Sequence, residues 1–138
     1  MGQRVCLLMG LIGFTFLLNS CGKPSNRAGV SGFVTCDGQP VEDGLIQFTP
    51  APGVDGPLVQ IQIQQGKYES PQVTRPTIGK NSVQITATKK TGKKVNNIMG
   101  EATDEQFQYI PARYNSDSEL TVDIQPGNNQ FDFKLSSE

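Results

Sequence analysis

Six segments of the chain alternate apolar and polar residues with a period of two, and this pattern constrains the fold more than any other feature. Successive side chains of a β-strand point to opposite faces, so the period is typical of strands with one face on a core and the other in water. The apolar positions of the six segments are Val30, Gly32, Val34 and Cys36; Ile46 and Phe48; Val59, Ile61 and Ile63; Val83, Ile85 and Ala87; Leu120, Val122 and Ile124; and Phe131, Phe133 and Leu135.

Turn signals separate these segments, at Asp37-Gly38, Glu42-Asp43-Gly44, Gln65-Gly66 and Pro126-Gly127-Asn128-Asn129. Such residues favour tight turns between short strands. After residue 20, no window of comparable length repeats apolar residues with the helical period, so any helices are minor. We therefore predict an all-β chain that forms a single antiparallel β-sandwich of about seven strands.

Residues 89–118 lack sustained alternation, and we predict a long connection there. Loops of more than about 12–15 residues in compact domains are usually functional or disordered. This stretch is therefore the first place to expect a binding surface, with Tyr109, Arg113 and Tyr114 as candidate interaction residues. The tyrosines can stack on a sugar, or they can pack on the sandwich edge with their hydroxyls bonded to backbone.

Charged residues in and near this stretch indicate solvated side chains rather than a charged binding site. The basic cluster at Lys89, Lys90, Lys93 and Lys94 is followed closely by acidic residues, which weaken its field. The paired carboxylates do not have the ligand spacing of a closed calcium site, so no metal is expected. These pairs are Glu42/Asp43, Asp104/Glu105 and Asp117/Glu119.

The N-terminus has the organisation of a signal peptide. A positively charged start, residues 1–4, precedes an uncharged run over residues 5–18. As a helix this run would span roughly 21 Å, which is short of the about 30 Å of a hydrocarbon core. A cleaved signal is therefore expected rather than a permanent transmembrane anchor.

The sequence Leu18-Asn19-Ser20-Cys21 at the end of this run resembles the lipobox of bacterial lipoproteins. The resemblance implies cleavage between Ser20 and Cys21 and attachment of a diacylglycerol to the Cys21 sulfur. An ordinary signal cleaved before an incidental cysteine and an uncleaved inserted segment are the alternatives. Two acyl chains are enough for stable anchoring, and Gly22 after the cysteine favours the outer membrane in a diderm bacterium.

Three regions follow from this interpretation: a lipoprotein signal peptide (1–20), a lipidated tether (21–29) and the β-sandwich (30–138). The tether GKPSNRAG is polar and contains Gly, Pro and Ser, a composition typical of flexible linkers. Cys36 then has no cysteine partner in the mature chain. We expect it to be a buried apolar residue of a strand rather than a reactive thiol.

Composition argues against an enzyme and against nucleic acid as a partner. The chain contains no histidine, so a nucleophilic serine or cysteine would lack the commonest general base. The formal net charge of -1 provides no field that would attract a polyanion.

The segment GVSGFVTCDGQPVEDGLIQFTP resembles the first hairpin of the carboxypeptidase regulatory-like domain, a transthyretin-like, Ig-like sandwich. The matching positions are Val30, Gly32, Val34, Asp37, Gly38, Pro40, Val41 and Gly44. The segments GKY (66–68), IPARYN (110–115) and LTVDIQPGNNQFDFKL (120–135) resemble small lipoproteins of planctomycete bacteria. Cys36, where Leu is common, and Gly44, where Ala or Ser often occurs, depart from the pattern. The resemblance implies a fold and a location but no reaction.

Together these features predict a non-enzymatic, membrane-anchored lipoprotein of the cell envelope that serves as a structural or protein-interaction module. The alternative is a module that binds carbohydrate or cell-wall polymer through residues 89–118. Expected partners are the lipid bilayer, through Cys21, and other envelope proteins or glycans. No cofactor is expected apart from the covalent lipid. The domain would lie in the periplasm or at the cell surface.

Overall fold

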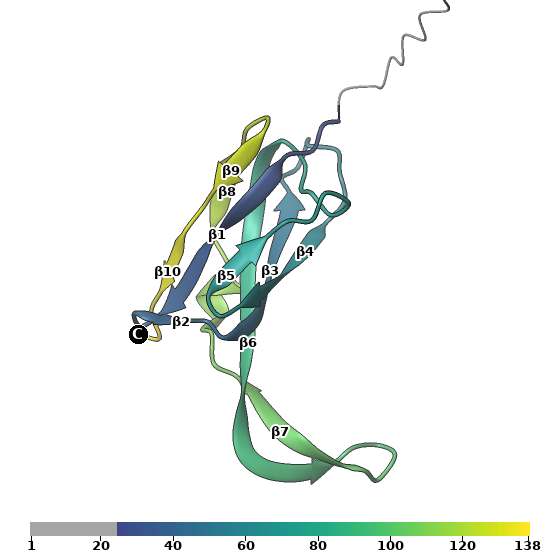
Figure 1. Cartoon of the computed structure of the whole chain (residues 1–138), viewed down its shortest axis with the longest axis vertical. Coiled ribbons are helices and arrows are strands. Elements are labelled where there is room, and N and C mark those ends of the chain that lie inside the picture. Colours follow the sequence, from purple (N-terminus) through teal and green to yellow (C-terminus); the bar gives the residue numbers. More distant parts are fainter. Residues whose placement is uncertain (1–24) are drawn as a thin grey trace, which may run out of the picture.

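The computed structural model describes residues 25–138, which form an all-β sandwich with one hairpin projecting from it (Figure 1). One short 3-10 turn, η1 (Ala112–Tyr114), is the only helical element in this range. The strands are β1 (Gly29–Cys36), β2 (Gln39–Pro40), β3 (Asp43–Pro50), β4 (Val59–Gln64), β5 (Lys67–Glu69), β6 (Gly79–Asn96), β7 (Ala102–Gln108), β8 (Thr121–Ile124), β9 (Asn128–Gln130) and β10 (Phe133–Leu135).

The core is built from the apolar positions of the alternating segments, as predicted. In β4, for example, Val59, Ile61 and Ile63 are buried and the three intervening glutamines are exposed. Tyr68, which no alternating segment contained, is also in the core. Side chains from β1, β3, β4, β6, β8 and β10 meet in one apolar cluster, so the inner faces of the sandwich share a single core.

The sheet runs in the order β10-β1-β5-β4-β3-β6-β7, with β2 and β9 also paired to β1 and β8 also paired to β6. Most neighbouring strands are antiparallel, as predicted. Strand β1 differs, because it pairs in parallel with both β9 and β10. The structure divides the predicted seven or so strands into ten, since β2, β5, β9 and β10 are pieces of two or three residues.

Two of the predicted turns are two-residue hairpin turns. Asp37 and Gly38 join β1 to β2 with φ angles of 50° and 77°, and Gln65 and Gly66 join β4 to β5 with φ angles of 50° and 79°. Positive φ at both central residues is the requirement of a type I′ turn, which matches the twist of the flanking strands. Cys36, which ends β1, is buried as expected, and burial raises the pKa of its thiol.

The turn predicted at Pro126–Asn129 does not join two paired strands. Strand β8, before it, pairs with β6, whereas β9, after it, pairs with β1 in parallel. The turn therefore carries the chain from one part of the sheet to another. Turn residues report local backbone geometry, and they do not identify the partner of the strand that follows.

Ordered contacts begin before Val30. Ala28 is buried and its N–H donates to the carbonyl of Pro76, while Arg27 forms an isolated bridge with Thr77. The last residues of the predicted tether thus pack on the sandwich, because backbone bonding holds them where the sequence has no alternation. The signal peptide, the cleavage position at Ser20 and the lipidation site at Cys21 lie outside the described residues.

The prediction of a long connection over residues 89–118 is wrong for much of its length. Strand β6 continues without a break to Asn96, and Ala102–Gln108 form β7 beside it. Residues 88–96 of β6 and the whole of β7 make a hairpin that contains no buried residue. Alternation reports burial of one face, so a strand with no buried face carries no such signal.

Candidate functional site

The second half of β6 and the whole of β7 form an arm that leaves the sandwich (Figure 1). Residues 81–87 of β6 pair with β3, whereas residues 88–96 pair only with β7. Beyond Lys89, each strand of the arm has the other as its only neighbour in the sheet. An arm that contributes nothing to the core is a candidate contact element, because a two-stranded ribbon alone is only marginally stable in water and its unpaired edges can pair with another chain.

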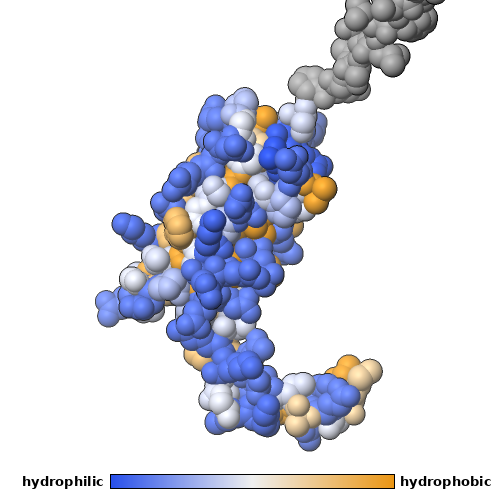
Figure 2. Space-filling model, viewed as in Figure 1, coloured by the Kyte–Doolittle hydropathy of each residue, from blue (hydrophilic) through white to orange (hydrophobic). Residues whose placement is uncertain are grey.

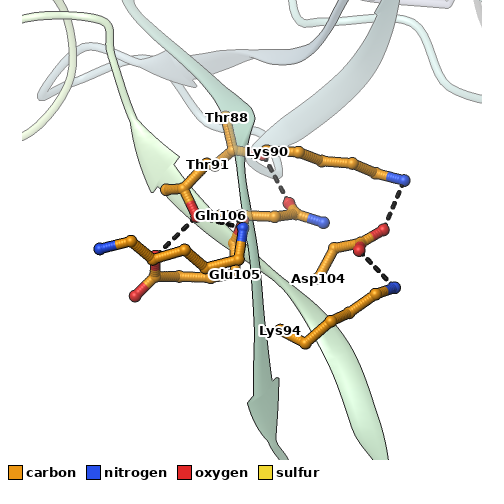
Figure 3. A network of polar contacts seen from close by, with 8 residues as sticks. Thr88, Lys90, Thr91, Lys94, Asp104, Glu105 and Gln106 are labelled. Atoms are coloured by element: carbon orange, nitrogen blue, oxygen red, sulfur yellow. Dashed lines mark hydrogen bonds and ion pairs between the residues drawn. The ribbon is translucent and has the colours of Figure 1, made fainter.

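One face of the arm is held by an ion-pair bridge (Figure 3). The Asp104 carboxylate lies 2.7 Å from the Lys90 ammonium and 2.6 Å from the Lys94 ammonium. Hydrogen bonding to Lys90, followed by that to Lys94, lowers the pKa of Asp104. The basic cluster predicted from the sequence is thus partly neutralised within the arm itself.

The backbone pairing of β6 with β7 is irregular between Lys90 and Lys94. Gly92 lies there with φ of 83°. The Thr91 hydroxyl donates to the Glu105 carboxylate at 2.6 Å and accepts from the Lys93 N–H at 3.2 Å. A β-bulge increases the twist of a ribbon, and these bonds hold the bulge in one geometry (Figure 3).

The tip of the arm is a turn fastened by Asn97. The Asn97 side-chain oxygen accepts from the N–H groups of Met99 and Glu101, both at 2.9 Å. Its amide nitrogen donates to the Glu101 carboxylate at 3.1 Å. Gly100 completes the turn with φ of 80° and donates its N–H to the Asn97 carbonyl. The tip is therefore a bonded turn rather than a loose loop.

This turn presents two large apolar side chains to solvent. Ile98 is 104% exposed and Met99 is 82% exposed. The apolar tip, defined here as these two residues, is visible at the end of the arm in Figure 2. The sequence analysis did not identify this apolar tip. Asn97 and Gly100 favour a turn, and they flank two apolar residues in an otherwise polar stretch, which was the available signal.

The three candidate residues of the sequence lie where the arm returns to the sandwich, not at its tip. Tyr109 is half-buried, and the Lys89 ammonium lies 4.2 Å from the centre of its ring. Burial is the largest cause of the raised pKa of Tyr109, and the negative charge of Glu42 adds to it. One face of the ring is thus already covered by a cation.

Arg113 and Tyr114 lie together and bind the C-terminal residues. The Arg113 guanidinium is 5.0 Å from the Tyr114 ring and donates to the carbonyls of Ser136 and Glu138. The Tyr114 hydroxyl accepts from the Ser136 N–H at 3.2 Å. The neighbouring Arg113 side chain, followed by the bond from the Ser136 N–H, lowers the pKa of Tyr114. This is the packed arrangement that the sequence offered as the alternative to sugar stacking.

Nothing in residues 25–138 forms a metal centre, since no group of three or more His, Cys, Asp or Glu side chains is suitably arranged. The same residues contain no helix with the length and apolar character of a membrane span.

Comparison with known proteins gives limited similarity. A DUF3823 family protein from Parabacteroides merdae matches 80% of this chain with a TM-score of 0.42 and 15% identity, and this chain spans 46% of its length. A 9R-lipoxygenase from Cyanothece matches 80% of this chain with a TM-score of 0.35 and 8% identity, and this chain spans 16% of it. No family model matches the sequence, and no curated protein is similar to it. Similarity this low carries no argument about function.

Proposed function

We propose that this protein is a non-enzymatic protein-interaction module, anchored to a membrane of a bacterial envelope through lipid on Cys21, and that the apolar tip of its arm contacts the partner. The observation that carries the proposal is the exposure of the large apolar side chains of Ile98 and Met99 on a hydrogen-bonded turn. Burying a large apolar side chain contributes about 1.5–3 kcal/mol, so covering both would supply a substantial part of a binding energy.

The shape of the tip supports a protein contact. A few well-packed apolar residues dominate most protein interfaces. A turn already held in its bound geometry loses little conformational entropy on binding. The bonds made by Asn97 and the Asp104 bridge supply this preorganisation along the arm.

The position of the arm supports a partner away from the anchoring membrane. The described chain enters the sandwich at the end opposite the arm (Figure 1). A lipid on Cys21 would leave only a few residues between membrane and sandwich, a reach of at most about 3.6 Å per residue. The tip would then point outward, toward other envelope proteins. We also propose that the sandwich is of the carboxypeptidase regulatory-like type, which its first hairpin resembles, and that the protein lies in the bacterial cell envelope.

The sugar-binding alternative has less support. Each tyrosine that would stack on a sugar is half-buried and has a cation against its ring. No specific contact in the described residues favours a glycan over a protein.

The anchoring part of the proposal is tested by Cys21→Ala. The variant should move from the membrane fraction to the soluble fraction, because the thiol that would accept the lipid is gone. Continued fractionation with membranes would overturn the anchor.

The tip is tested by photo-crosslinking in intact cells. A photoreactive phenylalanine analogue replaces Met99 in one protein and Val73, which is 86% exposed on a sandwich loop, in the control. We expect a discrete crosslinked protein from position 99 only. That protein, once purified, should bind the chain saturably and lose roughly tenfold in affinity on Ile98→Ser. Crosslinks to lipid alone, or none, would overturn the proposed contact.

A further inference from the structure

A cleft of about 670 Å³ lies at the base of the arm, away from its tip. One wall comes from β2 and the start of β3, with Gln39, Pro40, Glu42 and Asp43. The other wall comes from the arm and the residue that follows it, with Thr88, Lys89, Lys90, Gln106 and Tyr109. A hollow of this volume is within the size range of small-molecule sites in proteins.

The two walls carry opposite charges that do not neutralise each other. Among residues 25–138, neither Glu42 nor Asp43 forms an ion pair, and Lys89 forms none either. Lys90 is paired, but with Asp104 on the arm rather than across the cleft. Lys89 lies against the Tyr109 ring, which keeps its ammonium on the cleft side of the arm.

Neutral groups line the space between the charges. The Gln106 side-chain oxygen accepts from the Thr88 hydroxyl at 2.8 Å, so the Gln106 amide N–H groups remain available as donors (Figure 3). Gln39 provides a second amide on the facing wall. Amide side chains can both donate to and accept from a peptide group.

From this arrangement we propose that the cleft binds a small zwitterion of the amino-acid or short-peptide class. The ligand ammonium is placed at Glu42 and Asp43, and its carboxylate at Lys89. A ligand with only a negative charge would meet the carboxylates of Glu42 and Asp43, neither of which is in an ion pair. A ligand with only a positive charge would meet the ammonium of Lys89, which is not in an ion pair either. A ligand that carries both charges matches both walls. This site is independent of the apolar tip.

The test uses the full chain in detergent solution, titrated with the dipeptide alanyl-alanine by calorimetry and by amide chemical shifts. Saturable binding is expected, with shifts centred on Thr88, Lys89 and Gln106. Two blocked probes, N-acetyl-alanyl-alanine and alanyl-alanine amide, should each bind roughly tenfold more weakly, because each lacks one charge.

Charge-neutral variants assign the two ends of the ligand. Glu42→Gln combined with Asp43→Asn should abolish the preference for a free amine, and Lys89→Gln should abolish the preference for a free carboxylate. Lys67→Gln and Glu69→Gln, which remove an exposed ion pair on β5, serve as matched controls and should change neither preference. No saturable binding up to roughly 20 mM, or equal binding of the blocked probes, would overturn the site. Either result leaves the crosslinking test of the tip unaffected.

Discussion

The Tyr68 hydroxyl donates a hydrogen bond of 2.7 Å to the carbonyl oxygen of Phe131. Tyr68 is only 1% exposed, and its ring also lies near those of Phe48 and Phe133. The bond ties β5 to the segment that precedes β10, although the two residues are far apart in the chain. A single buried side chain thus joins two parts of the sandwich.

Replacing Tyr68 by Phe should lower the free energy of unfolding by about 1 kcal/mol, because one buried hydrogen bond is lost while the ring packing stays. Tyr68→Ala should cost about 3–5 kcal/mol, since the core also loses the ring. Urea denaturation of both variants measures the difference. Equal losses in the two variants would contradict a separate role for the hydroxyl.

Stability should fall as the pH rises above about 10, because burial, followed by the charge of Asp132, raises the pKa of Tyr68 above its ordinary value of 10.0. The unfolded chain then releases the proton while the folded chain retains it. The unfolded state therefore gains stability, by about 1.4 kcal/mol per pH unit for one such group. Thermal melts from pH 8 to 11 measure the loss. Tyr68→Phe should reduce the slope, and an unchanged slope would contradict the assignment.

Gly32→Ala should destabilise the sandwich by about 1–3 kcal/mol or more, the range for overpacking. An added Cβ would lie 1.9 Å from the carbonyl oxygen of Phe131, where backbone meets backbone and no flexible side chain can yield. Thr35→Ala, at a half-buried position of the same strand, is the control and should cost less than about 1 kcal/mol. Chemical denaturation separates the two. Similar losses would show that the close approach at Gly32 is unimportant.

Asp104→Asn should loosen the arm without unfolding the sandwich, because it removes the carboxylate that bridges Lys90 and Lys94. Amide hydrogen exchange in β7 should become roughly twofold faster or more, while exchange in β3 and β4 stays the same. The lowered pKa of Asp104 means that the bridge is present above the ordinary value of 3.8 and is lost as the pH falls through the folded-state pKa. The wild-type arm should therefore loosen in the same way in acid. No change in β7 exchange would contradict the clamp.

Asn97→Ala should weaken partner binding although both residues of the apolar tip remain. The change removes the side-chain bonds that hold the turn, so the tip would have to be ordered on binding. Stability of the sandwich should change by less than about 0.5 kcal/mol, because the position is remote from the core. Affinity for the crosslinked partner and the melting temperature are the measurements. Unchanged affinity would show that the turn does not need to be preorganised.

The sequence predicted the sandwich because its strands bury one face, and burial imposes a period of two on neighbouring residues. It predicted the hairpin turns at Asp37-Gly38 and Gln65-Gly66 for a similar reason, since positive φ is a local requirement. It also indicated that acidic residues would weaken the lysine cluster. It placed the candidate site at Tyr109, Arg113 and Tyr114, and two of these three bind the C-terminal residues instead.

Only the tertiary structure decided the arm, its apolar tip and the cleft at its base. Residues 88–96 of β6 and the whole of β7 contain no buried position, so they follow no burial pattern, and the pairing that forms the arm is between backbones. The parallel pairing of β1 with β9 and β10 brings together residues about one hundred positions apart. Glu42 and Lys89 likewise line the same cleft only in the folded chain. Local patterns report local burial, whereas which surfaces face one another depends on the path of the whole chain.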